Sequence, residues 1–419
     1  SGEFLIKAAG DPNCLLNLGN GVCAASDSSG NYTHNWNGQR DILGAVQRHN
    51  LFVFLNHDLG DGRELFAEYG QYQSEYNGNR HSVSHFSSVK FVVPATNPYN
   101  FTGKALLMDN YRFVDAGARV VDNDKQTDRY LVGVRGQTDD GWDWESAASY
   151  SVAEAFDVTH NRVSNTLMDA LLHRTDETAY NPFNGGGVYQ TGFVSHNPVD
   201  YTPGGIGPAL VDAYRANERT MTTLDFRMSK PDVFTITGGD VGMAFGVEAR
   251  NDTFMDDRDP RLDGTIVFTE RRTNGQLSTS AGDTYPYVSD LANSSPTPDN
   301  DGARNVNSVY LEFDVPLVSP EMNIPVVEQF DLQLAYRQEA YSDFEGTGVP
   351  RVAFGWVVND ILKIRGSQQD TFRAPNMITI NEQMVVRNNT RNDAATLYAV
   401  GLGIDTDDSD GRYSVQRQA

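Results

Sequence analysis

Residues 351–365 contain two short runs with strict alternation, separated by a tight turn at Asn359-Asp360. In 351–358 every second residue is large and apolar, and the alternation resumes in 362–365. A period of two is the signature of a strand with two unlike faces. Two such strands joined by two residues predict a β-hairpin. The apolar residues of the first run are Val352, Phe354, Trp356 and Val358.

The same alternation recurs along the chain, which predicts an all-β fold. Several of these segments reach the ~9–11 residues that a tilted strand needs to cross a bilayer. We expect roughly a dozen strands in all. Besides the hairpin, the alternating segments are 129–137, 142–158, 221–228, 241–250, 309–317 and 330–337.

Short and long connections are predicted to alternate between these strands. The short ones are rich in Gly, Asp and Pro and lie at 60–62, 139–141, 230–232 and 359–360. The long ones are polar and cover roughly 11–45, 77–127, 157–218 and 252–305. Structureless loops of such length are uncommon in compact soluble domains. Short turns at one end and long loops at the other are typical of an outer-membrane barrel, although a soluble β-sandwich also has two unlike faces.

Composition restricts the partners. Asp and Glu outnumber Lys and Arg by 56 to 33, which gives a formal net charge of −23. Such a charge argues against a nucleic-acid partner, because phosphate binding requires a basic surface. It also mildly disfavours a strongly anionic ligand. No run approaches the ~20 apolar residues of a transmembrane helix.

Three short motifs resemble a known family. The run Tyr341-Ser342-Asp343-Phe344, followed by Phe372-Arg373-Ala374-Pro375, is similar to the barrel of TonB-dependent outer-membrane receptors. The segment Asn97-Pro98-Tyr99-Asn100 resembles a loop of the same family. Further similarities follow in family order, so that the resemblance spans about residues 46–380. They lie at 111–119, 133–144, 246–250 and 309–319.

The resemblance implies an antiparallel transmembrane β-barrel of 22 strands, with long extracellular loops and short periplasmic turns. It implies a receptor in the bacterial outer membrane that contacts lipid and takes up a scarce ligand such as a siderophore, cobalamin, a saccharide or a peptide. Energy would come from the TonB–ExbB–ExbD complex through an N-terminal plug. No catalysis and no cofactor are implied. The alternatives are a passive porin and a secreted soluble β-rich binding module.

The chain departs from the family pattern at both ends. It shows no plug, no TonB-contacting segment and no terminal aromatic residue. We therefore expect residues 1–419 to be a portion of the barrel domain, with the plug and the C-terminal strands outside it. Because a partial barrel has open edges, this portion alone could not transport a ligand.

Few side chains are candidates for a site. Cys14 and Cys23 flank a Gly- and Asn-rich segment, and in the oxidising compartment that the resemblance implies we expect a disulfide rather than two free thiols. Arg373 is expected to be structural, capping acceptors or pairing with a loop carboxylate. The sequence assigns no substrate-binding residue.

Metal and catalytic motifs are not evident. His81 and His85 share a loop, but no HExxH occurs and we expect a polar loop without a bound metal. Residues 405–411 do not fit an EF-hand, and we expect them, like 122–128 and 256–259, to be solvated acidic loops. A nucleophile elbow is also missing, so nothing supports an enzyme.

Overall fold

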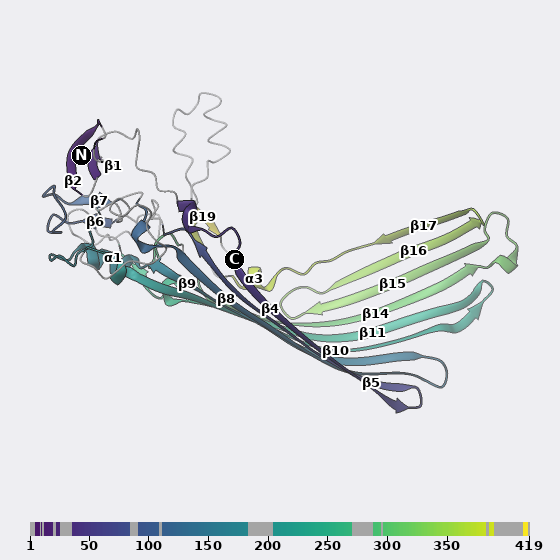
Figure 1. Cartoon of the computed structure of the whole chain (residues 1–419). Helices are drawn as coiled ribbons and strands as arrows, with labels where there is room; N and C mark the ends of the chain where they lie inside the picture. Colours follow the sequence, from purple (N-terminus) through teal and green to yellow (C-terminus); the bar gives the residue numbers. More distant parts are fainter. Residues whose placement is uncertain are drawn as a thin grey trace, which may run out of the picture.

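A computed structural model describes residues 5–8, 10, 12–19, 22–25, 36–83, 91–108, 111–182, 204–269, 288–294, 296–382, 385–388 and 414–417. Ten of the described strands form one large sheet: β4 (Ala45–Gly60), β5 (Arg63–Arg80), β8 (Arg119–Gln137), β9 (Asp143–Val163), β10 (Leu210–Ile236), β11 (Gly239–Arg258), β14 (Asn300–Val318), β15 (Gln329–Tyr341), β16 (Thr347–Asn359) and β17 (Leu362–Gln369). Figure 1 shows these strands running side by side over most of the length of the molecule.

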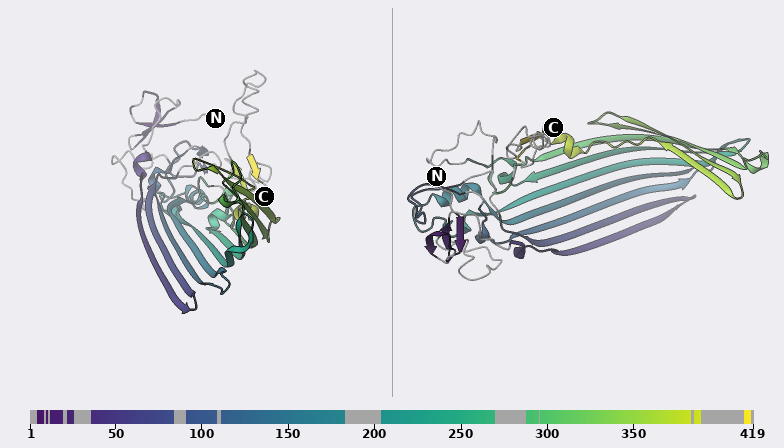
Figure 2. Two further views of the ribbon diagram at one scale, coloured as in Figure 1. Left: turned by 90° about the vertical axis from the view of Figure 1, so that its right-hand side faces the viewer. Right: turned by 90° about the horizontal axis from the view of Figure 1, so that it is seen from above.

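The large sheet has a simple topology. Its order is β17-β16-β15-β14-β11-β10-β9-β8-β5-β4, and each strand pairs antiparallel with its neighbours. The sheet is strongly curved and open between the edge strands β4 and β17 (Figure 2). An antiparallel meander of this kind is the wall of a partial barrel, which confirms the predicted fold class.

The strands are longer than the apolar alternation predicts. Strand β10 alone has 27 residues, and the predicted loops 77–127, 157–218 and 252–305 shrink to 81–118, 164–209 and 259–299. The extra length is polar, so no apolar period reveals it in the sequence. Residues 122–128 belong to β8 and 256–258 to β11, so the expectation of acidic loops there is wrong.

The turns at 60–62, 139–141 and 359–360 lie where they are predicted. The turn predicted at 230–232 is wrong, because this segment lies inside β10. Pro231 lacks an N–H, and the pairing with β11 is interrupted between Lys230 and Phe234. The chain then continues as a strand and reverses at 237–238. At Gly238 a Cβ would approach the Pro316 carbonyl oxygen to 2.0 Å, so this turn requires glycine.

Smaller elements lie mainly at the long-loop end, where they form a folded cap (Figure 1). The cap contains β6 (Phe91–Val93), β7 (Leu106–Met108), η2 (Val114–Ala116), α1 (Asn165–Leu172), η4 (Gly207–Ala209), α2 (Pro260–Asp263), β12 (Val267–Phe268) and β13 (Val288–Ser289). The remaining elements are β1 (Leu5–Ala8), β2 (Cys14–Gly19), β3 (Val22–Ala25), η1 (Trp36–Gln39), η5 (Pro320–Met322), α3 (Met377–Asn381), β18 (Val385–Asn388) and β19 (Ser414–Arg417).

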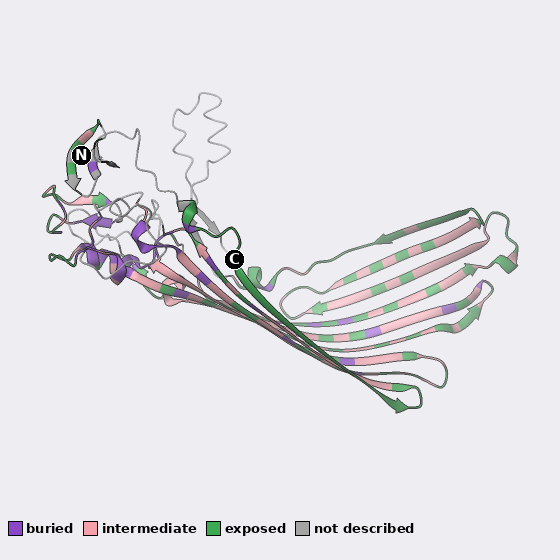
Figure 3. Ribbon diagram, in the orientation of Figure 1, coloured by how far each residue is buried: buried purple, intermediate pink, exposed green. Residues whose placement is uncertain are grey.

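Buried residues are concentrated in this cap rather than in the sheet (Figure 3). Phe91 and Phe113 are fully buried there and pack edge to face, with ring centroids 6.3 Å apart. Helix α1 adds Met168 and Leu171, both inaccessible. Ser164 begins α1 as its N-cap, accepting a hydrogen bond from the Leu167 N–H. The cap therefore has a hydrophobic core of its own.

The two faces of the large sheet differ in polarity. On the outward face Leu224, Val247, Val309 and Val352 are exposed, although large apolar side chains normally avoid water. A run such as 309–317 extends about 27 Å along the strand. When the strand is tilted by about 40°, the run rises about 21 Å along the barrel axis. This is close to the apolar band of a membrane barrel, which is about 25 Å tall. The exposed face does not fit a soluble module with a closed core.

A row of tyrosines marks the limit of the apolar band on the side of the long loops. Tyr69, Tyr130 and Tyr150 lie on neighbouring strands, with ring centroids 5.0 and 6.5 Å apart. On β5 and β8 the outward residues beyond this row are mostly polar, as at Gln71, whose Nε2 donates to Asp128 Oδ1 at 3.1 Å. Aromatic rows of this kind lie at the membrane–water interface of barrels. No helix in the described part of the chain is long and apolar enough to span a membrane.

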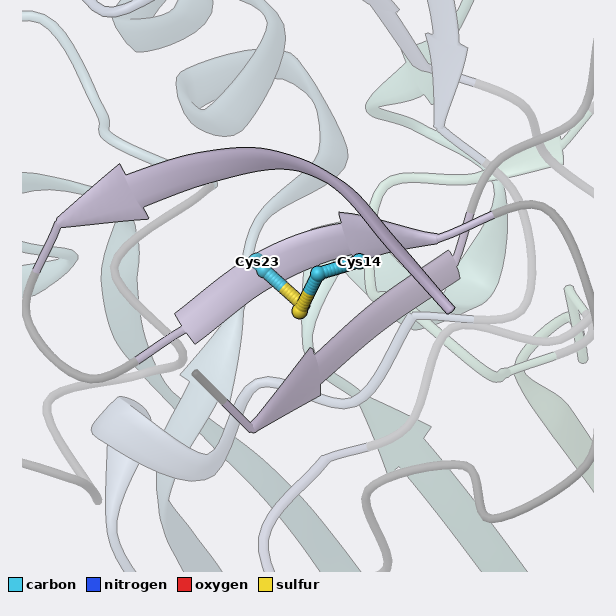
Figure 4. The surroundings of a disulfide bond; sticks show 2 residues. All are labelled: Cys14 and Cys23. Carbon is cyan, nitrogen blue, oxygen red and sulfur yellow. A yellow bond between two sulfur atoms is a disulfide. The ribbon is translucent and has the colours of Figure 1, made fainter. Parts of the chain in front are cut away.

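A disulfide links Cys14 on β2 to Cys23 on β3, the pair that the sequence predicts (Figure 4). Their Cα atoms are 5.6 Å apart, and Cys23 is almost fully buried. Strand β3 pairs with both β1 and β2 in a separate three-stranded sheet. The disulfide therefore joins two adjacent strands of that small sheet.

Candidate functional site

The inward face of the large sheet carries a row of alternating charges. Glu64, Arg135, Glu145 and Arg227 follow one another across β5, β8, β9 and β10. Arg135 Nη2 lies 3.0 Å from Glu64 Oε1, and Arg227 Nη2 lies 2.7 Å from Glu145 Oε1. These residues line a hollow of about 600 Å³. Because the charges neutralise one another, this part of the wall favours neither sign of ligand.

The motif Asn97-Pro98-Tyr99-Asn100 is a brace inside the cap. The buried Asn97 donates from Nδ2 to the carbonyl oxygens of Leu172 at 2.8 Å and Tyr180 at 3.2 Å. Its Oδ1 accepts the Tyr99 N–H at 2.9 Å. Asn100 Nδ2 donates to three further carbonyls within its own turn. The motif thus joins the turn between β6 and β7 to the end of α1.

Replacing Asn97 with Ala should destabilise the cap by about 2–3 kcal/mol, because two buried carbonyls lose their donor. Native-state hydrogen exchange of the full-length protein would measure this through the Tyr180 amide, which donates to Leu171 O. Asn50→Ala is the matched control, since Asn50 is exposed on β4. Equal protection of the Tyr180 amide in both variants would contradict the bracing role.

The two motif segments 341–344 and 372–375 contact each other at the end of β15. The Phe372 ring lies 5.9 Å from Tyr341 and 5.8 Å from Phe344, centroid to centroid. Ser342 Oγ accepts the Asn305 N–H, and the Ser342 N–H donates to Asn305 O. Asn376, next after Pro375, caps α3 by accepting the Ile378 N–H.

Arg304 of β14 holds both halves together. Its Nε donates to the two carboxylate oxygens of Asp343 at 2.8 and 2.9 Å, and its Nη2 donates to Pro375 O at 2.9 Å. The guanidinium also lies 5.6 Å from the centroid of Tyr341. The side chain is only 7% exposed. Arg304 therefore fixes the connection between β15 and β16 against the segment that follows β17.

The role expected for Arg373 is taken by Arg304 instead. Arg373 is exposed, and it forms no hydrogen bond or ion pair with another described residue. Ala374 and Pro375 are half-buried beside it. No sequence signal identifies Arg304, because it lies 39 positions before Asp343 and outside the apolar alternation of β14.

The cap also buries a titratable cluster. Tyr180 is inaccessible, and its hydroxyl lies 2.8 Å from that of Tyr111 and donates to Asp115 Oδ1 at 3.2 Å. Burial raises the pKa of Asp115 to about 6, and the hydrogen bond from Tyr180 partly offsets this rise. Burial also raises the pKa of Tyr180 well above its usual value. Asp115 is thus a cap group whose charge changes in the mildly acidic range.

The cap should lose stability as the pH rises from about 4 to about 6. In the unfolded chain Asp115 ionises near its ordinary pKa of 3.8, whereas in the fold it stays protonated up to about 6. Its contribution is therefore complete below pH 3.8 and is lost as the pH rises through 6, by about 3 kcal/mol. Hydrogen exchange of cap amides, compared between wild type and Asp115→Asn at pH 4.5 and 7.5, would measure it. A difference between the two proteins that is independent of pH would contradict the assignment.

Metal ligands do not converge in the part of the chain described, where no group of three His, Cys, Asp or Glu side chains could hold an ion. His85 and residues 405–411 lie outside the described residues. Asp256 is instead held by two arginines, with Arg215 Nε at 2.7 Å and Arg258 Nη2 at 2.6 Å.

One family model matches this chain. The family described as TonB dependent receptor-like, beta-barrel matches residues 159–415. Among solved structures, the chain is similar to one titled "Structure of the FpvAI-pyocin S2 complex", with 11% identity and a TM-score of 0.38. The similarity covers 76% of this chain and 35% of that one, so this chain spans about a third of that chain's length. No curated protein matches.

Proposed function

The chain belongs to the family of TonB-dependent receptor barrels, and on this premise we propose that it is part of an outer-membrane receptor that imports a scarce ligand. The ligand would be of the siderophore, cobalamin, saccharide or peptide class. The TonB–ExbB–ExbD complex would supply energy through the plug of the whole receptor. The family match over residues 159–415 is the observation that carries the proposal.

The two faces of the sheet support a place in the membrane. The apolar outward band below the tyrosine row would contact lipid, while the inward row from Glu64 to Arg227 would line an aqueous lumen. The hydrogen bonds of Asn97 inside the cap and of Arg304 at the end of β15 hold the loop end of the wall together. The cap would then present a folded surface to the outside, where the ligand arrives.

A deletion and complementation experiment tests this function. Cells lacking the full-length gene would be grown with iron chelates, cobalamin, oligosaccharides or peptides as the limiting nutrient, beside cells lacking TonB. We expect the deletion strain to lose growth on one nutrient and the TonB-deficient strain to lose growth on the same one. The full-length protein should fractionate with the outer membrane. Growth loss in the deletion strain alone would indicate a passive porin instead.

A further inference from the structure

Three arginines gather at the loop end of the wall. Arg80 and Arg119 are direct partners in the register of β5 and β8. This register is continuous back to the pair of Glu64 and Arg135, and both spacings are even, so Arg80 and Arg119 face the lumen as that pair does. Arg162 lies at the same end of the next strand, β9. Its Nη2 donates to Ala292 O at 3.3 Å and to Ser294 Oγ, beneath the cap.

These arginines differ from three arginines further along the inward face of the wall. Arg129, Arg135 and Arg227 each pair with a glutamate on an adjacent strand. By contrast, none of the three mouth arginines (Arg80, Arg119 and Arg162) forms an ion pair with any residue that the structure describes. Arg119 donates from Nε to the His81 carbonyl oxygen at 3.0 Å, which is a neutral acceptor. The Nε of Arg162 is buried and has no hydrogen-bond partner among the described residues.

The charges of this cluster interact with one another. Burial lowers the pKa of Arg119, and the nearby guanidinium groups of Arg80 and Arg112 lower it further. Burial likewise lowers the pKa of Arg162 to about 10, with smaller contributions from Arg119 and Arg80. Like charges held together in a half-buried place repel each other, and an anion between them would relieve that repulsion. In a chain of net charge −23, this uncompensated positive cluster is an exception.

We propose that the mouth arginines form a binding site for a small oxyanion with two or more negative charges, the acidic group of the ligand that the receptor imports. This identification of the ligand rests on the proposed function, whereas the binding itself does not. Guanidinium groups match the geometry of carboxylate and phosphate oxygens, and both chemistries share this recognition. The inward face excludes the phosphate groups of lipid headgroups as the source. The overall acidity of the chain disfavours a strongly anionic ligand, but these arginines would bind one locally.

Calorimetry of the purified full-length receptor with citrate and with pyrophosphate tests the site. We expect one of the two probes to bind, with an affinity that falls as salt is raised, because salt screens exposed charges. The better probe identifies a carboxylate or a phosphate ligand. Arg80→Gln should weaken binding about tenfold, and Arg80→Lys less. Arg80 is the residue to change, since it is exposed and no described residue bonds to its side chain.

Arg63→Gln is the matched control. Arg63 is the first residue of β5 and Arg80 the last, and Arg63 pairs with Asp61 at the short-turn end. Its loss should leave the affinity unchanged. Binding of neither probe, or equal affinities of Arg80→Gln and Arg63→Gln, would overturn the site. Normal probe binding with uptake that does not need TonB would overturn the proposed function and leave the site intact.

Discussion

Replacing Arg304 with Ala should destabilise the loop end of the barrel wall by about 3–5 kcal/mol, the usual effect of removing one partner from a buried ion pair. Asp343 would keep its charge in a place where it is only 18% exposed, and Pro375 O would lose its donor. The midpoint of heat-modifiable gel mobility in the full-length protein would measure the change. Barrel proteins migrate differently folded and unfolded, so this midpoint reports assembly directly.

Two further variants define the role of Arg304. Arg373→Ala is the matched control, and it should change the midpoint little because Arg373 is exposed. The double variant Arg304→Ala, Asp343→Ala should recover part of the lost stability, since the stranded charge is removed with its partner. An equally low midpoint for Arg373→Ala and Arg304→Ala would contradict the assignment of this structural role to Arg304.

Replacing Phe354 with Arg should cost about 2–4 kcal/mol and reduce barrel assembly, because the new charge would lie in the apolar band that we propose contacts lipid. Phe354 is 37% exposed, and its ring stacks on Phe330 with centroids 5.9 Å apart. Leu332 is its partner in the β15–β16 register, on the same outward face. The fraction of heat-modifiable protein in outer-membrane vesicles is the measurement.

The adjacent residue provides the control. Ala353→Arg introduces the same charge one position earlier, on the inward face, where Ala353 lines a hollow of about 430 Å³ together with Asp331 and Lys363. This variant should assemble normally, as should Arg351→Gln. If Phe354→Arg and Ala353→Arg assembled equally well, the facing of β16 would be wrong.

The centres of the strands could be predicted from the sequence, and their ends could not. The hairpin at 351–365 is confirmed by the pairing of β16 with β17. It could be predicted because every second residue of 351–358 is large and apolar. Beyond the tyrosine row β5 and β8 carry polar residues on both faces, and polar pairs such as Asn77 and Asp122 carry no apolar period that a sequence reveals. Strand β4 cannot be predicted from alternation, because Leu51 to Leu55 are all apolar.

The candidate site was the harder part to predict. The motif residues Asn97 and Asp343 could be found by resemblance, but their partners could not. Asn97 acts on carbonyls 75 and 83 positions away, and such contacts have no local signature. The mouth arginines were hidden for the same reason, because pairing of distant strands brings them together. The net charge of −23 concealed a local positive cluster.

Whether the outward face contacts lipid while the inward face contacts water is best measured by spin labels at adjacent positions. Leu334→Cys and Gln333→Cys, each labelled in the full-length protein in bilayers, would be compared for collisions with oxygen and with a water-soluble nickel chelate. Leu334 is outward and exposed, and Gln333 lines the inward hollow. We expect oxygen to reach the label at 334 and the chelate to reach the label at 333. Equal access of the chelate to both would contradict a membrane-spanning wall.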